Sequence, residues 1–247
     1  MSISFITEND WCVDMTKVDE RKKVAAVILA AGSGTRMNIR DRKQMIDIDG
    51  KTVLQHTVSV FESSPIIDSI VVVTKSEDLE KTKIDMSEFV KVKRVVSGGS
   101  VRSESARIGF LAIDGESDYV AIHDAVRCAV TEQIIASVLD SAIKYGAATA
   151  GSYIYDTVKR IDIDGNIIAT LDRSELFAAH TPQIFEVGLY RRALSASGDL
   201  SAVTDDNSLL ERIGILVKAV DTGAENVKIT TVSDLEYSKF LLKKREK

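Results

Sequence analysis

Residues 24–37 read VAAVILAAGSGTRM, an apolar run that ends in a glycine-rich segment. The apolar run at residues 24–30 predicts a short strand that is covered on both of its faces. Glycines let the backbone approach a ligand closely, and successive N–H groups of such a loop can bind phosphate oxygens. The stretch therefore predicts a buried parallel strand that runs into a glycine turn, which could bind a ligand or could simply be a tight connection from strand to helix.

The sequence beyond this stretch repeats the same alternation. Residues 52–63 carry apolar side chains at helical spacing, and β-rich runs follow at Ser69–Thr74, 91–96 and 119–122. Apolar strands that alternate with amphipathic helices predict a Rossmann-like α/β fold, with a mostly parallel sheet and helices on both faces. Ligands of such sheets bind beyond the carboxyl ends of the strands, so functional residues are expected just after each strand.

The pattern changes after residue 150. Residues 153–160 and 166–173 flank Asp164-Gly165, a dipeptide typical of tight β-hairpins. Both flanking segments are too polar for a core strand. The sequence therefore predicts a projecting β-hairpin arm at about residues 152–173.

The remaining chain completes the predicted organisation. Residues 216–220 and 227–231 are expected to form two further strands, and a closing helix is expected to begin near Ser233. No low-complexity linker or internal repeat divides the sequence. We therefore expect a single domain over residues 24–247, the arm included, and an N-terminal extension over residues 1–23.

Composition excludes several classes of protein. The 247 residues carry a net charge of −5, which argues against broad binding to nucleic acid. Two cysteines are too few for a disulfide framework and suit a reducing compartment. No apolar run approaches the ~18 residues of a membrane span, and residues 1–23 lack the apolar centre of a secretory signal. A cytoplasmic protein without a membrane partner is expected.

Two cations accompany the glycine loop. Arg36 lies within it and Lys43 follows seven positions later. A dinucleotide fingerprint is not indicated, because Met37 occupies the place of its third glycine and the second strand ends in Thr74-Lys75 without an acidic residue. Two cations beside such a loop suit a triphosphate whose charge must be neutralised during transfer. The alternative is that both are solvated surface charges.

A second polar segment, SGGSVRSES at residues 97–105, follows the third predicted strand. It could form a base-recognition loop, in which backbone groups and hydroxyls meet the edge of a nucleobase. It could equally be a turn in which Ser100 caps the next helix, supported by Glu104.

A third segment, HDAVR at residues 123–127, follows the strand at 119–122. Asp124 at a strand end is a natural Mg²⁺ ligand, because Mg²⁺ takes one or two carboxylates together with phosphate oxygens. Arg127 could hold a phosphate with two parallel hydrogen bonds. The competing account is an Asp124–Arg127 ion pair that only ties the loop.

Together the segments carry a family resemblance. LAAGSGTRM followed by KQ, SGGSVRSES, HDAVR, DTVKR, LDRSELFAAHTPQ, VTDDNSLLERIG and ENVKITT occur in order between about residues 24 and 240. In this order and spacing they resemble the 2-C-methyl-D-erythritol 4-phosphate cytidylyltransferases of isoprenoid synthesis, although the first motif alone marks a wider nucleotidyltransferase superfamily. The resemblance implies CTP and Mg²⁺ as cosubstrate and cofactor, release of pyrophosphate, and a homodimer interlocked through the arm.

The resemblance also implies roles for individual residues. Arg36 and Lys43 would stabilise the α-phosphate in the transition state, Asp124 would face the metal, and Arg127 would be a cation on the substrate side. Thr157 and Arg173 would reach the substrate of the neighbouring subunit, and Lys228 would position the attacking phosphate near Thr181. Ser100 stands where some members carry an acidic residue. The nucleotide would be bound by a set of small residues: Ala30, Ala31, Gly32, Gly34, Gly99, Ser100 and Ser105.

The sequence departs from the family pattern in places and leaves alternatives open. Val126 and Cys128 replace an alanine and a proline, and Phe177 and His180 replace a common tryptophan and glutamine. These changes remove no charged group, but they lie in segments that the resemblance assigns to the acceptor side of the site. The alternatives are a ribitol-5-phosphate cytidylyltransferase, a non-catalytic nucleotide-binding homologue and, less favoured, a nicotinamide-binding module. A phosphate acceptor is already deprotonated at neutral pH, so no general base is needed, and His56, His123 and His180 are expected to be structural.

Overall fold

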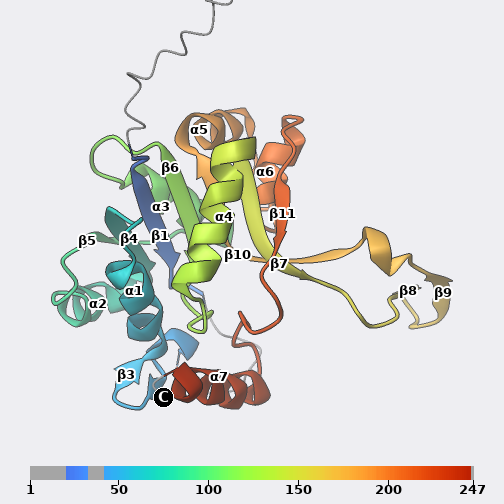
Figure 1. Ribbon diagram of the computed structural model, residues 1–247, viewed down its shortest axis with the longest axis horizontal. Coiled ribbons are helices and arrows are strands. Elements are labelled where there is room, and N and C mark those ends of the chain that lie inside the picture. Colours follow the sequence, from blue (N-terminus) through green and yellow to red (C-terminus); the bar gives the residue numbers. More distant parts are fainter. Residues whose placement is uncertain (1–20, 33–41, 246–247) are drawn as a thin grey trace, which may run out of the picture.

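The computed structural model describes residues 21–32 and 42–245 of the chain, and its first strand is the apolar run quoted above (Figure 1). β1 (Val24–Leu29) is buried at every position. Its alternate side chains enter two separate hydrophobic clusters. The first cluster contains Val24, Ala26 and Ile28, and the second contains Val27 and Leu29. Side chains alternate between the faces of a strand, so this division places a core on each face of the sheet.

A seven-stranded sheet forms the centre of the protein, in the order β11-β7-β10-β6-β1-β4-β5. β1 pairs in parallel with β4 and β6, and β10 alone runs antiparallel to its neighbours. The expected mostly parallel sheet is thereby confirmed. The strands that join β1 are β4 (Ser69–Thr74), β5 (Val92–Ser97), β6 (Tyr119–Asp124), β7 (Ala147–Tyr153), β10 (Phe177–Glu186) and β11 (Lys218–Asp221).

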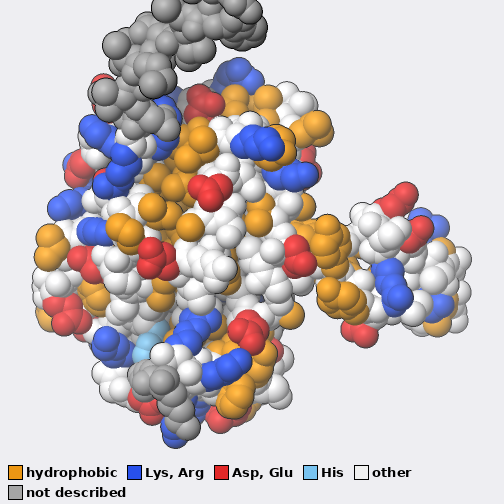
Figure 2. Space-filling model, in the orientation of Figure 1, with side chains coloured by type: hydrophobic (Ala, Val, Ile, Leu, Met, Phe, Trp, Pro, Cys, Tyr) orange, Lys and Arg blue, Asp and Glu red, His pale blue; other side chains and the backbone are white. Residues whose placement is uncertain are grey.

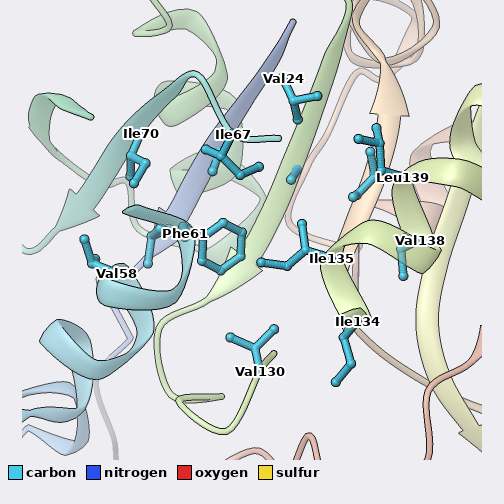
Figure 3. Packing of buried hydrophobic residues seen from close by; sticks show 14 of the residues in the cluster. Val24, Val58, Phe61, Ile67, Ile70, Val130, Ile134, Ile135, Val138 and Leu139 are labelled. Carbon is cyan, nitrogen blue, oxygen red and sulfur yellow. The ribbon is translucent and has the colours of Figure 1, made fainter. Parts of the chain in front are cut away.

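Helices cover both faces of this sheet. α1 (Val53–Ser63) and α4 (Glu132–Tyr145) bury Phe61 and Ile135 in the first cluster, where Figure 3 shows both side chains against the strands. The second cluster lies on the opposite face and contains residues of α3 (Arg102–Leu111), α5 (Val187–Ala196) and α6 (Asn207–Arg212). The short α2 (Leu79–Asp85) packs beside β5 at the sheet edge.

Local sequence fixes the ends of the two helices on the first face. Thr52 and Gln55 form a capping box at the start of α1, each side chain bonding the other residue's backbone N–H. Thr131 accepts from the N–H of Ile134 at the start of α4, and Gly146 ends that helix with φ of 85°. Glycine adopts this left-handed conformation without the steric cost that a side chain brings.

The predicted arm leaves the sheet between β7 and β10 and projects to one side (Figures 1 and 2). Its hairpin consists of β8 (Lys159–Ile161) and β9 (Ile167–Thr170), with a turn in which Gly165 has φ of 88°. A 3-10 turn, η4 (Arg173–Glu175), follows. The hairpin is confirmed, although its strands are shorter than the predicted 153–160 and 166–173.

The last part of the chain contains one correction. Residues 227–231 were expected to form a strand, but they lie in an irregular segment that leads into α7 (Val232–Arg245). Ile229 donates its backbone N–H to Val126 O at 2.9 Å and packs in a third cluster with Cys128 and Leu235. This cluster joins α7 to the small hairpin of β2 (Asp47–Ile48) and β3 (Lys51–Thr52).

The beginning of the described chain is attached to the sheet. Arg21 forms an ion pair with Asp68 at 2.7 Å, and the backbone N–H of Lys23 donates to Asp118. Residues 1–20 of the expected N-terminal extension lie outside the described residues. Among the helices that the structure describes, none combines the length and the apolar character that crossing a membrane requires.

Candidate active site

A cavity of about 640 Å³ lies beyond the carboxyl ends of β1, β4, β5 and β6, where the sheet topology predicts it. Nine of the predicted site residues line it: Ala30, Ala31, Gly32, Lys43, Gly99, Ser100, Ser105, Asp124 and Lys228. Gly34 and Arg36 lie outside the described residues. The remaining predicted residues, Arg127, Thr157, Thr181 and Arg173, are not among the lining residues.

The glycine loop after β1 is held by hydrogen bonds at its base. The Gln44 side chain donates to Ala30 O at 2.8 Å, and Ala30 N donates to Val73 O at 2.7 Å. Lys43 belongs to the 3-10 turn η2 (Lys43–Met45), is buried, and donates from Nζ to Thr230 O at 2.9 Å. The contact presents Lys43 at the cavity wall, beside the segment that carries Lys228.

The second loop, after β5, touches the first. An added Cβ at Gly98 would lie 2.7 Å from both Ala31 Cβ and Ser105 Oγ, so only glycine allows the two loops to approach this closely. Ser105 Oγ also accepts the N–H of Gly99 at 3.1 Å.

The predicted helix cap at Ser100 is wrong in its position, because α3 begins at Arg102 with Val101 as the N-cap residue. The expected support from Glu104 is present, since its carboxylate accepts from Ser100 N at 2.8 Å. The loop between β5 and α3 is therefore fixed by Glu104 and Ser105 together.

Asp124 ends β6 and lies between two cations. Its Oδ2 accepts from Lys228 Nζ at 2.7 Å, and its Oδ1 accepts from Arg102 Nε at 3.0 Å. Burial alone would raise the pKa of the Asp124 carboxyl, but the charges of Arg102 and Lys228 outweigh burial and hold that pKa far below its ordinary range. Asp124 is therefore a carboxylate at neutral pH.

Arg102 was not among the predicted site residues, although it lies within the quoted SGGSVRSES segment. It is the only cation of that segment, and this was the signal available in the sequence. Its Nη1 donates to Asp206 Oδ2 at 2.7 Å, and the Asp206 side chain is fully buried. Asp206 belongs to the VTDDN segment, so the pair joins two motifs that lie 104 positions apart.

Thr181 and His123 fix the backbone of Asp124 through a chain of hydrogen bonds. β10 is irregular between Ala179 and Gln183, and the Thr181 hydroxyl there accepts the backbone N–H of Asp124 at 3.0 Å. His123 Nε2 lies 3.3 Å from Arg127 O, and its Nδ1 lies 3.1 Å from the Thr181 hydroxyl. A carbonyl only accepts, so Nε2 carries the proton and Nδ1 accepts from Thr181. Burial lowers the pKa of His123 to about 3, which keeps this imidazole neutral.

Arg127 is not among the residues that line the cavity, and its expected role as a substrate-side cation stays a prediction. It is buried, and its Nη1 donates to Asn226 O at 2.7 Å. No ion pair joins the described side chains of Asp124 and Arg127, so the alternative of a loop-tying pair is wrong. Burial lowers the pKa of Arg127 to about 10. Its contact with Asn226 fixes the segment just before Lys228.

Thr157 and Arg173 lie on the arm and are exposed. The Arg173 guanidinium donates to Tyr155 O, which ties the two sides of the arm together near its base. The arm projects away from the body that contains the cavity (Figure 1). Within one chain, these two side chains therefore do not join the other predicted residues.

The donor set at the cavity fits a magnesium ion. Two acidic side chains line it, Asp124 and Glu77: Glu77 pairs with Arg42 at 2.5 Å, and Asp124 with Arg102 and Lys228. No group of three or more His, Cys, Asp or Glu side chains suited to a metal occurs among the described residues. One or two carboxylates do not suit a metal held by protein alone, but they suit Mg²⁺, which takes its other ligands from phosphate and water.

Together, this sheet and this cavity define an α/β protein of the nucleotidyltransferase type. Two glycine loops bound the pocket, Arg102 and Lys228 flank one carboxylate, and Lys43 lines the same cavity. The sequence model of one family in this class, 2-C-methyl-D-erythritol 4-phosphate cytidylyltransferase, matches residues 24–244. The chain belongs to this family.

Individual relatives agree with the assignment. A 2-C-methyl-D-erythritol 4-phosphate cytidylyltransferase of Syntrophus aciditrophicus is 39% identical over 230 residues, covering 92% of this chain and 98% of its own. One of Caldanaerobacter subterraneus is 40% identical over 228 residues, covering 90% and 99%. The crystal structure of 4-diphosphocytidyl-2C-methyl-D-erythritol synthase from Anaerococcus prevotii superimposes with a TM-score of 0.75 at 30% identity, covering 90% and 96%.

Proposed function

We propose that the protein transfers CMP from CTP to 2-C-methyl-D-erythritol 4-phosphate, giving 4-diphosphocytidyl-2-C-methyl-D-erythritol and pyrophosphate. The observation that carries the proposal is the position of Asp124 between Lys228 and Arg102, at the wall that Lys43 shares. A carboxylate for the metal and cations for two phosphate groups meet in one cavity. Family membership supplies the identity of donor and acceptor.

The transfer is an in-line displacement. An oxygen of the acceptor phosphate attacks the α-phosphorus of CTP, a P–O bond forms, and the bond to the β-phosphate breaks as pyrophosphate leaves with its electron pair. The acceptor oxygen is already ionised, because the second pKa of a phosphate monoester lies near ~6. Positioning and charge stabilisation are therefore the main contributions of the protein.

Lys43 and Lys228 contribute the charge at the described part of the cavity. Lys43 would face the triphosphate from the glycine-loop side, and Arg36, from the same segment, is proposed to share this role. Lys228 would bind the acceptor phosphate from the opposite side. Removing one such contact from a reacting phosphate typically costs ~10²–10³ in rate.

Mg²⁺ is proposed as the cofactor, held by Asp124 and by oxygens of the triphosphate. When bound, it supplies positive charge that neutralises the charge developing on the leaving pyrophosphate. Asp124 is suited to this role because its pKa lies far below neutrality and its backbone is fixed by Thr181.

No histidine is assigned a role as general base. His56, His123 and His180 all lie within the described residues, and none lines the cavity. His56 contacts Ile48 O at 2.8 Å, and burial lowers the pKa of His180 to about 4. The expectation that a phosphate acceptor needs no base fits this arrangement.

A homodimer through the arm is part of the proposal. Large apolar side chains on the arm are exposed, among them Tyr155, Ile161, Ile163 and Ile167, and hydrophobic side chains gather where the arm leaves the body (Figure 2). A lone two-stranded hairpin is marginal in water, so packing against a second subunit would stabilise it. Thr157 and Arg173 would then reach the acceptor in the partner's cavity. A cytoplasmic location stays a prediction.

The test is pyrophosphate release with CTP, Mg²⁺ and a choice of acceptors. Turnover is expected with 2-C-methyl-D-erythritol 4-phosphate and much less with ribitol 5-phosphate. Lys43→Ala should lower kcat by ~10²-fold, whereas Lys51→Ala, an exposed lysine on β3, should leave it unchanged. Equal or faster turnover of ribitol 5-phosphate would contradict the acceptor, and a normal kcat for Lys43→Ala would contradict its role.

A further inference from the structure

We propose that Arg102 is a positioning residue for Asp124. Asp206 fixes Arg102, and Arg102 stays bonded to one oxygen of the Asp124 carboxylate. When Asp124 binds a metal–triphosphate, Lys228 is then the cation that leaves Asp124. The inference rests on the proposed function and assigns a role to Arg102 and Asp206, which the family resemblance left without one. It follows from how differently the two cations of Asp124 are held.

Arg102 is fixed by contacts on both sides. Nε donates to Asp124 Oδ1 at 3.0 Å and Nη1 donates to Asp206 Oδ2 at 2.7 Å. Arg102 is also the first residue of α3, so its backbone is held by the helix. A planar guanidinium that bridges two carboxylates has little freedom to rotate.

Asp206 is itself held by groups that lie away from the cavity wall. Its Oδ1 accepts from the Tyr190 hydroxyl at 2.6 Å, and its backbone N–H donates to Gln183 Oε1 at 3.0 Å. Tyr190 is fully buried and stacks on Phe185, with ring centroids 5.2 Å apart. Asp206, which fixes Arg102, is therefore bonded directly to a side chain of the second hydrophobic cluster.

Lys228 has no comparable support among the contacts that the structure describes. It lies in the irregular segment before α7, its side chain is 41% exposed, and its ammonium donates to Asp124 Oδ2. A lysine ammonium is a single charge on a flexible stem. A metal ion that binds Asp124 repels both Arg102 and Lys228. Lys228 is held by fewer contacts, so it is the one that moves.

Two variants with one control separate this role from general stability. Arg102→Lys keeps the positive charge but cannot bridge two carboxylates. Tyr190→Phe keeps the stacked ring and removes only the hydroxyl bonded to Asp206. Tyr119→Phe, the control, makes the same change in a buried tyrosine at the opposite end of β6.

The measurement is the binding of CTP by calorimetry, once with Mg²⁺ and once with EDTA, together with kcat for those variants that turn over. The ratio of the two dissociation constants reports how well Asp124 couples the metal to the nucleotide. Arg102→Lys should reduce this ratio by ~10-fold, because it breaks the bridge between the two carboxylates, and Tyr190→Phe by ~3-fold, because it removes only one hydrogen bond from Asp206. Tyr119→Phe should leave the ratio unchanged.

The outcomes are separable. A folded Arg102→Lys variant with the wild-type ratio overturns the inference, and if that variant does not fold, a wild-type ratio in Tyr190→Phe overturns it instead. An equal loss in Tyr119→Phe would also overturn it, because the effect would then be one of general stability. A wild-type protein that binds metal–CTP but releases no pyrophosphate contradicts the proposed function and leaves the coupling measurement valid.

Discussion

At the scale of single residues, the site depends on side chains whose charge state is set by their surroundings. Asp124 is ionised because two cations outweigh its burial, and His123 is neutral because it is buried between a hydroxyl donor and a carbonyl. Protonation of Nδ1 would remove the acceptor that Thr181 uses, and Thr181 holds the backbone of Asp124. A histidine outside the cavity therefore contributes to the geometry inside it.

This environment predicts how stability depends on pH. The pKa of His123 is about 3 in the folded protein and about 6.5 when unfolded, so its contribution to stability is complete above pH 6.5 and is lost as the pH falls toward 3. Between pH 7 and pH 5 the loss is about 2 kcal/mol, or about 4–8 °C in Tm. His123→Gln keeps a donor and an acceptor without titrating, so its Tm should fall less over this range.

Thermal melts of both proteins at pH 7 and pH 5 provide the measurement. His180, whose pKa is also lowered, leaves part of the pH dependence in the variant. The difference between the two proteins is the quantity of interest. Equal decreases in Tm would show that His123 is not the group responsible.

At the scale of elements, α4 shows how a few residues fix a boundary. Thr131 caps its first turn and Gly146 ends it in the left-handed region, directly before β7 begins at Ala147. The change from helix to strand thus takes place at one glycine. An added Cβ there would also lie 2.8 Å from Leu189 Cδ1.

Gly146→Ala should therefore destabilise the protein. The left-handed conformation costs an L-residue about 1–2 kcal/mol, which corresponds to a decrease in Tm of about 2–8 °C for a chain of this size. Gly198→Ala is the matched control, because Gly198 has no positive φ and an added Cβ there meets no atom within 4 Å. If the two variants have the same Tm, the left-handed conformation of Gly146 does not limit stability.

Local pattern predicted β1, β4, β5, β6 and β11, but it did not predict β7 and β10 of the same sheet, and its prediction of a strand at residues 227–231 was wrong. VKITT is rich in β-branched residues, but its side chains contact different parts of the protein. Lys228 bonds to Asp124 at the cavity, and Ile229 packs in the third cluster. β propensity expresses a fit to a pleated surface, and this segment has no strand beside it. Asp124 could be predicted because it directly follows an apolar strand. Arg102 could not, because its role depends on Asp206, far along the chain.

At the scale of the whole molecule, the arm is the part that one chain does not explain. It carries Arg173 and exposed apolar residues away from the body, while the cavity lies at the strand ends (Figure 1). In the proposed homodimer each arm would complete the other subunit's site around a two-fold axis. Arg173 and Lys43 of one chain would then serve different cavities.

Subunit mixing tests this arrangement. Arg173→Ala and Lys43→Ala homodimers should each be nearly inactive, because every site in them lacks one residue. In a mixed dimer one site carries both changes and the other carries neither, so activity should return to about half of wild type per heterodimer. Failure to recover activity, with heterodimers demonstrated by mass, would assign Arg173 to its own subunit's cavity.

The position of Lys228 and Thr230 in the chain has a consequence for biosynthesis. All seven strands of the sheet are complete by Asp221, yet the cavity still lacks the wall that these two residues provide, and Lys43 lacks the carbonyl of Thr230. In synthesis from the N-terminus, the residues of the sheet are therefore made before the residues that complete the cavity wall. A polypeptide that ends near residue 225 would contain the residues of every strand but would lack Lys228 and the carbonyl that Lys43 uses, so we expect it to be inactive.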